Sequence, residues 1–225
     1  MPTVQDLLGL RMFEGMGRAD MERLAQGATE VAAPSGTVVF RHGDPCTGMY
    51  VVMRGQVKLS LETERGHEKV LQLIAEGETF GEAALFLGQR HITTAQSIAD
   101  SVLLHVAREA VLQEVNRDPA FARRLIEELS RQVRARVLDL QSHTLLSGRE
   151  RVVAYLLERL PGLMNGGAVS IILPARKGII ASRLNVTQEH FSRILHDLAA
   201  TGLIEVRGPT VRIPDVGRLE SALRT

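Results

Sequence analysis

Three polar residues near the C-terminus, Glu189, Ser192 and Arg193, recur at the spacing that places side chains on one face of a helix. An arginine fork fits the O6 and N7 acceptors of guanine in the major groove of DNA, and a carboxylate can accept a hydrogen bond from the N4 amine of cytosine. Gln188 lies beside them on the same predicted face. These four residues are therefore candidate base contacts. The alternative is an exposed ion pair between Glu189 and Arg193, worth about 0.3 to 0.5 kcal/mol.

The helix that must carry these residues has an apolar opposite face. Its apolar residues recur every three or four positions: Phe191, Ile194, Leu195 and Leu198. Thr187 stands just before it, where a hydroxyl can accept a bond from a backbone N–H of the first turn, so the helix is expected to begin at about Gln188. A shorter apolar segment, 179–184, precedes it and contains Ala181, which leaves room for a closely crossing helix. The pattern predicts a helix-turn-helix with a tight turn at 185–187.

Two short alternating segments follow, at 202–206 and 211–213, and a Gly-Pro turn joins them. This pattern predicts a β-hairpin wing, and so a winged helix-turn-helix DNA-binding domain over 145–225. Residues 148–225 carry 11 Lys and Arg against 7 Asp and Glu, which suits binding to phosphates of double-stranded DNA. The candidate phosphate contacts are Arg176, Lys177, Thr187, Arg207 and Arg212.

A long helix is predicted over 116–144, because the segment from Pro119 to about His143 contains neither glycine nor a further proline. Its apolar residues form a narrow seam at spacings of four, four, four and three: Leu125, Leu129, Val133, Val137 and Leu140. A long seam flanked by charges is typical of a coiled-coil dimer interface. The alternative is a helix packed on its own domain. A two-fold dimer would place two recognition helices one DNA turn apart, so the operator is expected to be palindromic.

Residues 1–115 are predicted to form a sensor domain of short strands, with short helices at its N-terminus. β-Branched or alternating runs are separated by glycines and lie at 37–40, 49–53, 56–61, 69–74 and 102–106. Such spacing indicates a small all-β barrel or jelly roll. The fold class of the whole chain is therefore expected to be α+β.

Composition excludes several classes of protein. The chain of 225 residues is 44% apolar, which is enough for two modest cores. Its single cysteine, Cys46, excludes an internal disulfide framework. No apolar run approaches the roughly 18 residues of a membrane span, and the N-terminus lacks the pattern of a signal peptide. A cytoplasmic protein that does not associate with a membrane is expected.

Over nearly its whole length the chain resembles the Crp/Fnr superfamily of bacterial transcription regulators. The string TQEHFSR resembles the Fnr-type recognition helix, and SGTVVFRHGDP with MYVVMRGQVKL resembles the β-roll of the cyclic-nucleotide-binding type. The strings FGEAALFLGQRHITTAQSIADS and FSRILHDLAATGLI are most similar to the Dnr branch, whose members regulate dissimilative nitrate respiration in response to nitric oxide.

This resemblance implies a homodimeric regulator that senses an effector in the β-roll and relays it through the dimer helix. It implies that Glu189, Ser192 and Arg193 read TTGA-like half-sites, with Gln188 where Crp-type readers carry a further arginine. Contact with RNA polymerase is implied as well, with activation the commoner outcome.

The resemblance also points to an effector pocket, formed here by Gly81, Glu82, Ala83, Thr93 and Thr94. In nucleotide-binding members a Gly-Glu pair contacts the ribose, which Gly81-Glu82 matches, and an Arg-Ser pair clamps the phosphate. Thr93 and Thr94 fall in that second region, and Arg90 lies two residues short of it. A cyclic phosphate without a guanidinium loses its main charge-assisted bonds, which argues against cyclic AMP.

The Dnr branch implies haem as the cofactor. A [4Fe-4S] cluster is excluded, because it requires four thiolates. The seven histidines, at 42, 67, 91, 105, 143, 190 and 196, show no diagnostic spacing, so no metal or haem ligand is assigned. Two alternatives stay open: a cyclic-nucleotide-responsive regulator on the same scaffold, and a cupin-like metal enzyme using some of His42, His91 and His105. The paired His-x-His and Glu of cupin-like sites does not occur, so no enzyme activity and no catalytic residues are expected.

Overall fold

A computed structural model describes residues 11–62, 68–160 and 167–223. The chain divides into two units, residues 1–134 and 135–225, and the helix α5 (Pro119–Leu145) runs from the first into the second. Of the predicted dimerisation helix, 116–144, residues 119–144 lie in α5, whereas 116 and 117 end the preceding helix, α4 (Arg108–Arg117). The domain boundaries at 115 and 144 stay predictions, because the division into units falls inside that helix.

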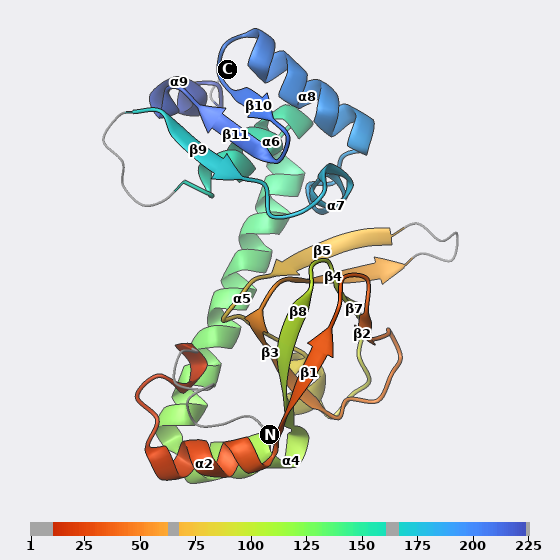
Figure 1. The fold of residues 1–225 in the computed structure, drawn as a ribbon, viewed down its shortest axis with the longest axis vertical. Coiled ribbons are helices and arrows are strands. Elements are labelled where there is room, and N and C mark those ends of the chain that lie inside the picture. The colour runs from red at the N-terminus through yellow and green to blue at the C-terminus, as the bar shows by residue number, and fades with distance from the viewer. Residues whose placement is uncertain (1–10, 63–67, 161–166, 224–225) are drawn as a thin grey trace. The chain divides into compact units, whose positions relative to one another are not determined.

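The first unit contains two four-stranded antiparallel sheets, as the predicted jelly roll requires (Figure 1). One sheet has the order β1-β8-β3-β6 and the other β2-β7-β4-β5. The strands are β1 (Ala28–Ala33), β2 (Val38–Phe40), β3 (Gly48–Arg54), β4 (Val57–Glu62), β5 (Glu68–Ile74), β6 (Thr79–Phe80), β7 (Thr94–Ser97) and β8 (Ser101–Ala107). Sequence patterns did not predict β1, β6 or β7. The sequence of β1, ATEVAA, is low in β-branched residues, and β6 has only two residues, too few to show a pattern.

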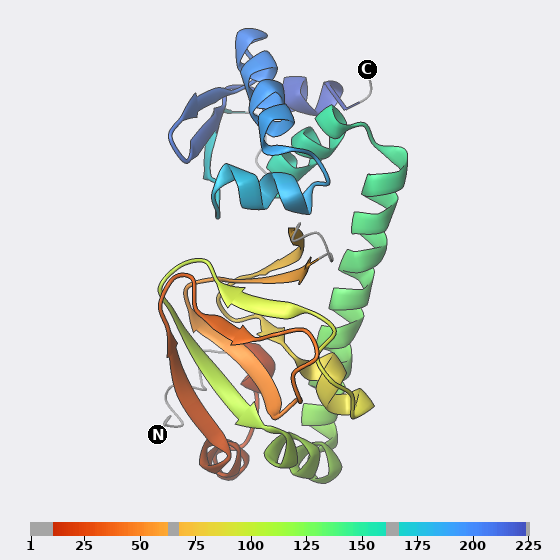
Figure 2. The ribbon, with the colours of Figure 1, turned by 90° about the vertical axis from the view of Figure 1, so that its right-hand side faces the viewer.

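Short helices flank these sheets. They are the 3-10 helix η1 (Arg11–Phe13), α2 (Arg18–Gln26), α3 (Glu82–Leu87) and α4 (Arg108–Arg117). The helices α2 and α4 lie side by side at one end of the β-roll (Figure 1, Figure 2). The first turns of α5 pack on this end, where Phe121 stacks on Phe13 with ring centroids 6.4 Å apart.

One residue of the predicted dimer seam belongs to the core instead. Leu125 is 3% exposed and packs with Leu104 and Val111 in the core of the first unit, so its assignment to the seam is corrected. Leu129 is half-buried, whereas Val133, Val137 and Leu140 are 59 to 67% exposed. The exposed stripe of α5, defined here as Val133, Val137 and Leu140, is thus shorter than the predicted seam, because the start of the helix is covered by its own domain.

The second unit is a winged helix-turn-helix, as predicted. After α5 come α6 (Gly148–Leu157), β9 (Val169–Ile172), α7 (Lys177–Arg183), α8 (Gln188–Ala200), β10 (Glu205–Arg207), β11 (Thr210–Ile213) and α9 (Val216–Ser221). The hairpin β10–β11 is extended by β9, a third strand that sequence patterns did not predict, in the order β10-β11-β9. In the described part of the chain, no helix combines the length and apolar character needed to span a membrane.

Candidate DNA interface and effector region

The recognition helix, α8, is held by one buried face and a capped N-terminus. Its side chains Phe191, Ile194, Leu195 and Leu198 are at most 4% exposed and form part of the core of the second unit. Thr187 has extended backbone angles, and its Oγ1 accepts a hydrogen bond from the His190 N–H at 3.1 Å. Both features match the sequence prediction for this helix.

The turn between α7 and α8 is tight, as expected. Asn185 adopts a left-handed backbone with φ of +56°, a conformation that asparagine tolerates better than most residues. The turn is closed by backbone bonds from Asn185 N–H to the Ser182 carbonyl at 3.2 Å and from Val186 N–H to the Ala181 carbonyl at 3.0 Å. Ala181 is buried and belongs to the core of the second unit.

The outer face of α8 presents the predicted base contacts. Glu189 and Arg193 are exposed and Ser192 is half-buried. Within the described residues, Glu189 and Arg193 form no ion pair with each other, so the alternative of an exposed Glu189–Arg193 ion pair does not apply to this helix. The guanidinium and the carboxylate are therefore available to bind an external ligand.

Gln188 differs from the other three predicted base contacts. A Cβ atom built on Gly178 would lie 2.6 Å from Gln188 Oε1, so the side-chain amide rests directly against α7. Gly178 allows this approach because it has no side chain. Gln188 thus connects α8 to α7 here, and its role as a base contact stays a prediction.

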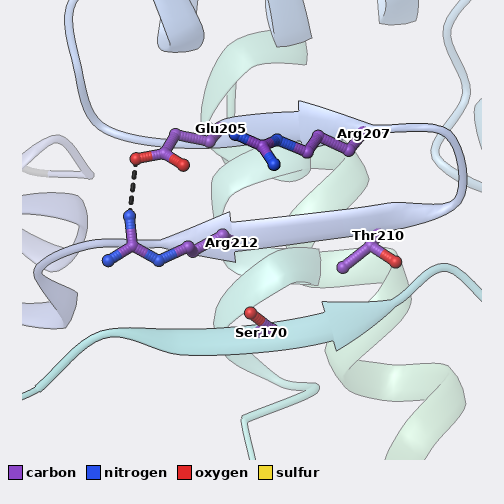
Figure 3. Close-up of a pocket in the computed structure, with 5 residues that line it drawn as sticks. All are labelled: Ser170, Glu205, Arg207, Thr210 and Arg212. Carbon is purple, nitrogen blue, oxygen red and sulfur yellow. Dashed lines mark hydrogen bonds and ion pairs between the residues drawn. The ribbon is translucent and has the colours of Figure 1, made fainter.

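Candidate phosphate contacts lie around this face, on α7, at the cap of α8 and on the wing. Arg176 and Arg207 are exposed, and Lys177 is half-buried. Arg207 and Arg212 line a cavity of about 410 Å³ on the sheet, together with Ser170, Glu205 and Thr210 (Figure 3). Arg212 Nη1 already pairs with Glu205 Oε1 at 2.6 Å, because the two residues face each other across β10 and β11. The charge of Arg212 is therefore partly neutralised.

In the first unit, the turn at Gly81 is at the centre of the predicted effector pocket. Gly81 has φ of +92°, and a Cβ atom there would lie 3.4 Å from the Gly48 carbonyl oxygen and 3.7 Å from His91 Cε1. Glu82 is 3% exposed, and its Oε1 accepts bonds from Thr79 Oγ1 at 2.6 Å and Gln132 Nε2 at 2.7 Å. Glu82 Oε1 is thus already hydrogen-bonded to two side chains of the protein itself.

The other predicted pocket residues differ in exposure, and their place in an effector pocket stays a prediction. Ala83 is exposed, Thr93 is half-buried, and Thr94 Oγ1 accepts a bond from the His42 N–H at 3.1 Å. Arg90 is exposed and donates from Nη1 to the Gly43 carbonyl at 2.8 Å. His91, which the sequence analysis did not assign to the effector pocket, lies beside Gly81.

His91 belongs to a chain of five packed rings. It stacks on Phe40 at 3.6 Å, Phe40 packs on both Tyr50 and Phe80, and the ring centroid of His105 is 4.8 Å from that of Tyr50. Burial lowers the pKa of both imidazoles, although Asp44 partly opposes this at His91. Both imidazoles are therefore neutral at neutral pH, the form that can ligate a metal ion.

Two further groups bear on metal or redox chemistry. Burial raises the pKa of the Cys46 thiol, which keeps it protonated, and its Sγ donates to the Gly48 carbonyl at 3.3 Å. Asp20, Glu114 and Asp118 bring carboxylate oxygens within 4.8 Å of one another, but Arg23 pairs with Asp20 and Glu114, and Arg124 pairs with Asp118. The two arginines offset most of the negative charge of the three carboxylates. His67 lies outside the described residues.

Comparison with known proteins matches both units to one family. A cyclic nucleotide-binding domain matches residues 30–118 and a Crp-like helix-turn-helix domain matches residues 150–222. The Cyclic AMP receptor protein of Thermus thermophilus is 28% identical over 94% of this chain and 96% of its own. The crystal structure of DNR from Pseudomonas aeruginosa is 30% identical, covers 96% of both chains and has a TM-score of 0.51.

The chain belongs to the Crp/Fnr family of DNA-binding transcription regulators. The fold of this Crp/Fnr regulator is also that of FixK2 from Bradyrhizobium japonicum, with a TM-score of 0.76, 24% identity, and coverage of 86% of this chain and 96% of the other. The family and its relatives are regulators and not enzymes, so the cupin-like alternative is set aside. Members of the family bind small effectors in the cyclic nucleotide-binding domain.

The exposure of Arg193 predicts a specific defect in base recognition. Replacing Arg193 with alanine should cost about 1 to 3 kcal/mol of discrimination at one G·C pair in each half-site, because the two-pronged donor to guanine is lost. Binding of Arg193→Ala to operators with that pair intact or changed, measured by fluorescence anisotropy, checks this. As a control, Arg207→Ala should weaken binding to all duplexes alike and lower its salt dependence. An unchanged preference in Arg193→Ala would contradict the assignment.

The buried imidazoles predict a loss of stability in mild acid. Their pKa values are lower in the folded state than the value of about 6.5 in the unfolded chain, so the unfolded chain binds protons first as the pH falls. The free energy of unfolding of the first unit should therefore be fully retained above about pH 6.5 and decrease below it. Urea unfolding at pH 7.5 and 5.5 checks this. The pH dependence should be smaller in His91→Phe than in wild type, and equal dependence in the two proteins would refute the prediction.

Proposed function

We propose that this Crp/Fnr regulator is a homodimeric transcription activator that reads TTGA-like half-sites of a palindromic operator. The observation that carries the proposal is the exposed polar face of α8, on which Glu189, Ser192 and Arg193 lie opposite the buried stripe. Arg193 supplies the fork for guanine and Glu189 the acceptor for cytosine. In this proposal the flanking phosphates are contacted by Arg176, Lys177, Thr187, Arg207 and Arg212. Arg212 either leaves its ion pair with Glu205 or binds Glu205 and a phosphate together.

The exposed stripe of α5 supports dimerisation. Val133, Val137 and Leu140 are spaced by four and three residues, the repeat that brings two helices together along one seam. Large apolar side chains that are 59 to 67% exposed lose contact with water when a second copy covers them. In the proposal, the dimer places two copies of α8 in successive major grooves, and an effector that favours one dimer arrangement changes DNA affinity.

The regulatory output in this proposal is activation through contact with RNA polymerase, as the family resemblance implies. Its site of action is the cytoplasm, because the protein must reach DNA there. The Dnr branch is the part of the family that we favour, since the chain is 30% identical to DNR from Pseudomonas aeruginosa over 96% of both chains.

Selection from a random library of DNA duplexes tests the DNA-binding proposal without assuming the operator. The full-length protein should enrich an inverted repeat with TTGA-like half-sites about one helical turn apart. Light scattering of the same sample should give the mass of two chains, and Val137→Asp should shift it toward one chain. Enrichment of no sequence, or of a single half-site by a monomer, would overturn the proposal.

For the effector, we propose nitric oxide bound to haem in the β-roll. His91 or His105 would hold the iron, because these are the two imidazoles of the ring series in the β-roll and burial lowers the pKa of each. Haem would supply the iron that binds nitric oxide, and the stack of His91 on Phe40 would have to open to admit it. The second candidate is a cyclic nucleotide, favoured by the matched domain and by the likeness to a Cyclic AMP receptor protein. It is disfavoured because Arg90 bonds to Gly43 and not to the Gly81 turn.

Absorption spectra and calorimetry separate the two effectors. Protein reconstituted with haemin should show a stoichiometric Soret band that shifts with nitric oxide, and the band should be changed in His91→Ala or His105→Ala. Calorimetry with cyclic AMP and cyclic GMP should show no binding. Absence of a stoichiometric band would overturn the haem proposal, and saturable heat with a cyclic nucleotide would favour the second candidate.

A further inference from the structure

We infer that Arg151 is a positioning residue that ties the hinge between α5 and α6 to the turn of the helix-turn-helix, and so sets where α8 lies. The inference rests on the proposed reading of DNA by α8 and adds a residue that does not lie on its reading face. All the contacts involved lie within the second unit, residues 135–225.

The hinge is a short and well-defined segment. The helix α5 ends at Leu145, and α6 begins at Gly148 with a capping box formed by Ser147 and Glu150. Glu150 Oε2 accepts from the Ser147 N–H at 2.6 Å, and Ser147 Oγ accepts from the Glu150 N–H at 3.3 Å. These reciprocal bonds fix the first turn of α6, so the direction in which α6 leaves the hinge is set locally.

Arg151 lies in the next position of that first turn and bonds to both sides of the joint. Its Nη1 donates to the carbonyl of Leu146 in the hinge at 2.8 Å, and its Nη2 donates to the carbonyl of Asn185 in the turn at 3.3 Å. A planar guanidinium can hold two carbonyl groups at a fixed separation, which the point charge of a lysine ammonium cannot do. The hinge and the turn are thus joined through one rigid group.

Gly148 brings the hinge against α8 itself. A Cβ atom on Gly148 would lie 3.2 Å from Val186 Cγ1 and 3.5 Å from His190 Nε2. The hinge therefore touches the residue after Asn185 and the first turn of the recognition helix. A methyl group at Gly148 would crowd Val186, because 3.2 Å is tighter than an ordinary van der Waals contact, whereas 3.5 Å from His190 is an ordinary one.

A parallel contact joins the last turns of α5 to α7. Arg183 Nη2 lies 3.5 Å from Asp139 Oδ1, and Arg136 also pairs with Asp139 at 3.1 Å. The first helix of the helix-turn-helix is thus held from α5, while its turn is held from the hinge. Because α7, the turn and α8 are connected in sequence and packed together, a change in the hinge angle must move the reading face of α8 relative to the end of α5.

This arrangement predicts a defect in sequence discrimination without a change of charge. Arg151→Lys keeps the charge and loses the two-carbonyl bridge, so the ratio of affinities for the selected operator and for unrelated duplex should fall by about tenfold, because the joint must then be ordered when α8 binds. Affinity for unrelated duplex and its salt dependence should stay as in wild type. Arg149→Lys is the matched control, since Arg149 is exposed two residues away, and it should behave as wild type.

Gly148→Ala perturbs the contact between the hinge and the turn independently of Arg151, and it tests the inference if Arg151→Lys does not fold. It leaves Arg151 in place and should reduce the ratio of affinities for the selected operator and for unrelated duplex, while its thermal midpoint stays close to that of wild type. If both variants fold and discriminate like wild type, the inference is wrong while the proposed function stands. If the wild-type protein selects no duplex at all, the proposed function fails and this inference fails with it.

Discussion

Burial of one face of α8 is the constraint on which the DNA interface depends. Each large apolar side chain that is fully buried contributes about 1.5 to 3 kcal/mol, whereas an exposed ion pair on the opposite face contributes at most about 1 kcal/mol. Burial therefore decides how the helix is rotated. Because the helix has 3.6 residues per turn, burying Phe191 and Leu195 leaves Glu189 and Arg193 facing outward. The turn, the cap at Thr187 and the contacts of Arg151 then fix its position along the protein surface.

In the β-roll, the buried carboxylate that follows Gly81 is hydrogen-bonded by other side chains of the protein. Glu82 is buried and bonded by Thr79 and Gln132, and the imidazole of His91 lies beside Gly81. A buried carboxylate without these donors would be costly, so an effector that displaces them must replace their bonds. Gln132 belongs to α5, so a change in the hydrogen bonds of this turn also changes a contact of the helix that carries the exposed stripe.

The sequence alone was sufficient where local rules decide the structure. The cap at Thr187 and the apolar period of α8 are local, as is the hairpin of the wing, and all were predicted. Contacts between distant segments were not. Leu125 continues the apolar period of the seam, and only the fold shows that its own domain covers it. The pairing of Arg212 with Glu205 depends on strand register, and the place of His91 depends on how the loop after α3 closes on Gly81.

Methylation interference at guanine N7 tests the central claim, that α8 reads base edges in the major groove, most directly. The selected duplex is methylated sparsely, bound by the full-length protein, and the bound and free fractions are compared. Interference is expected at one guanine in each half-site, at positions related by a two-fold axis, and it should be lost when Arg193 is replaced by alanine. Uniform binding of all methylated molecules, or interference that Arg193→Ala does not alter, would contradict it.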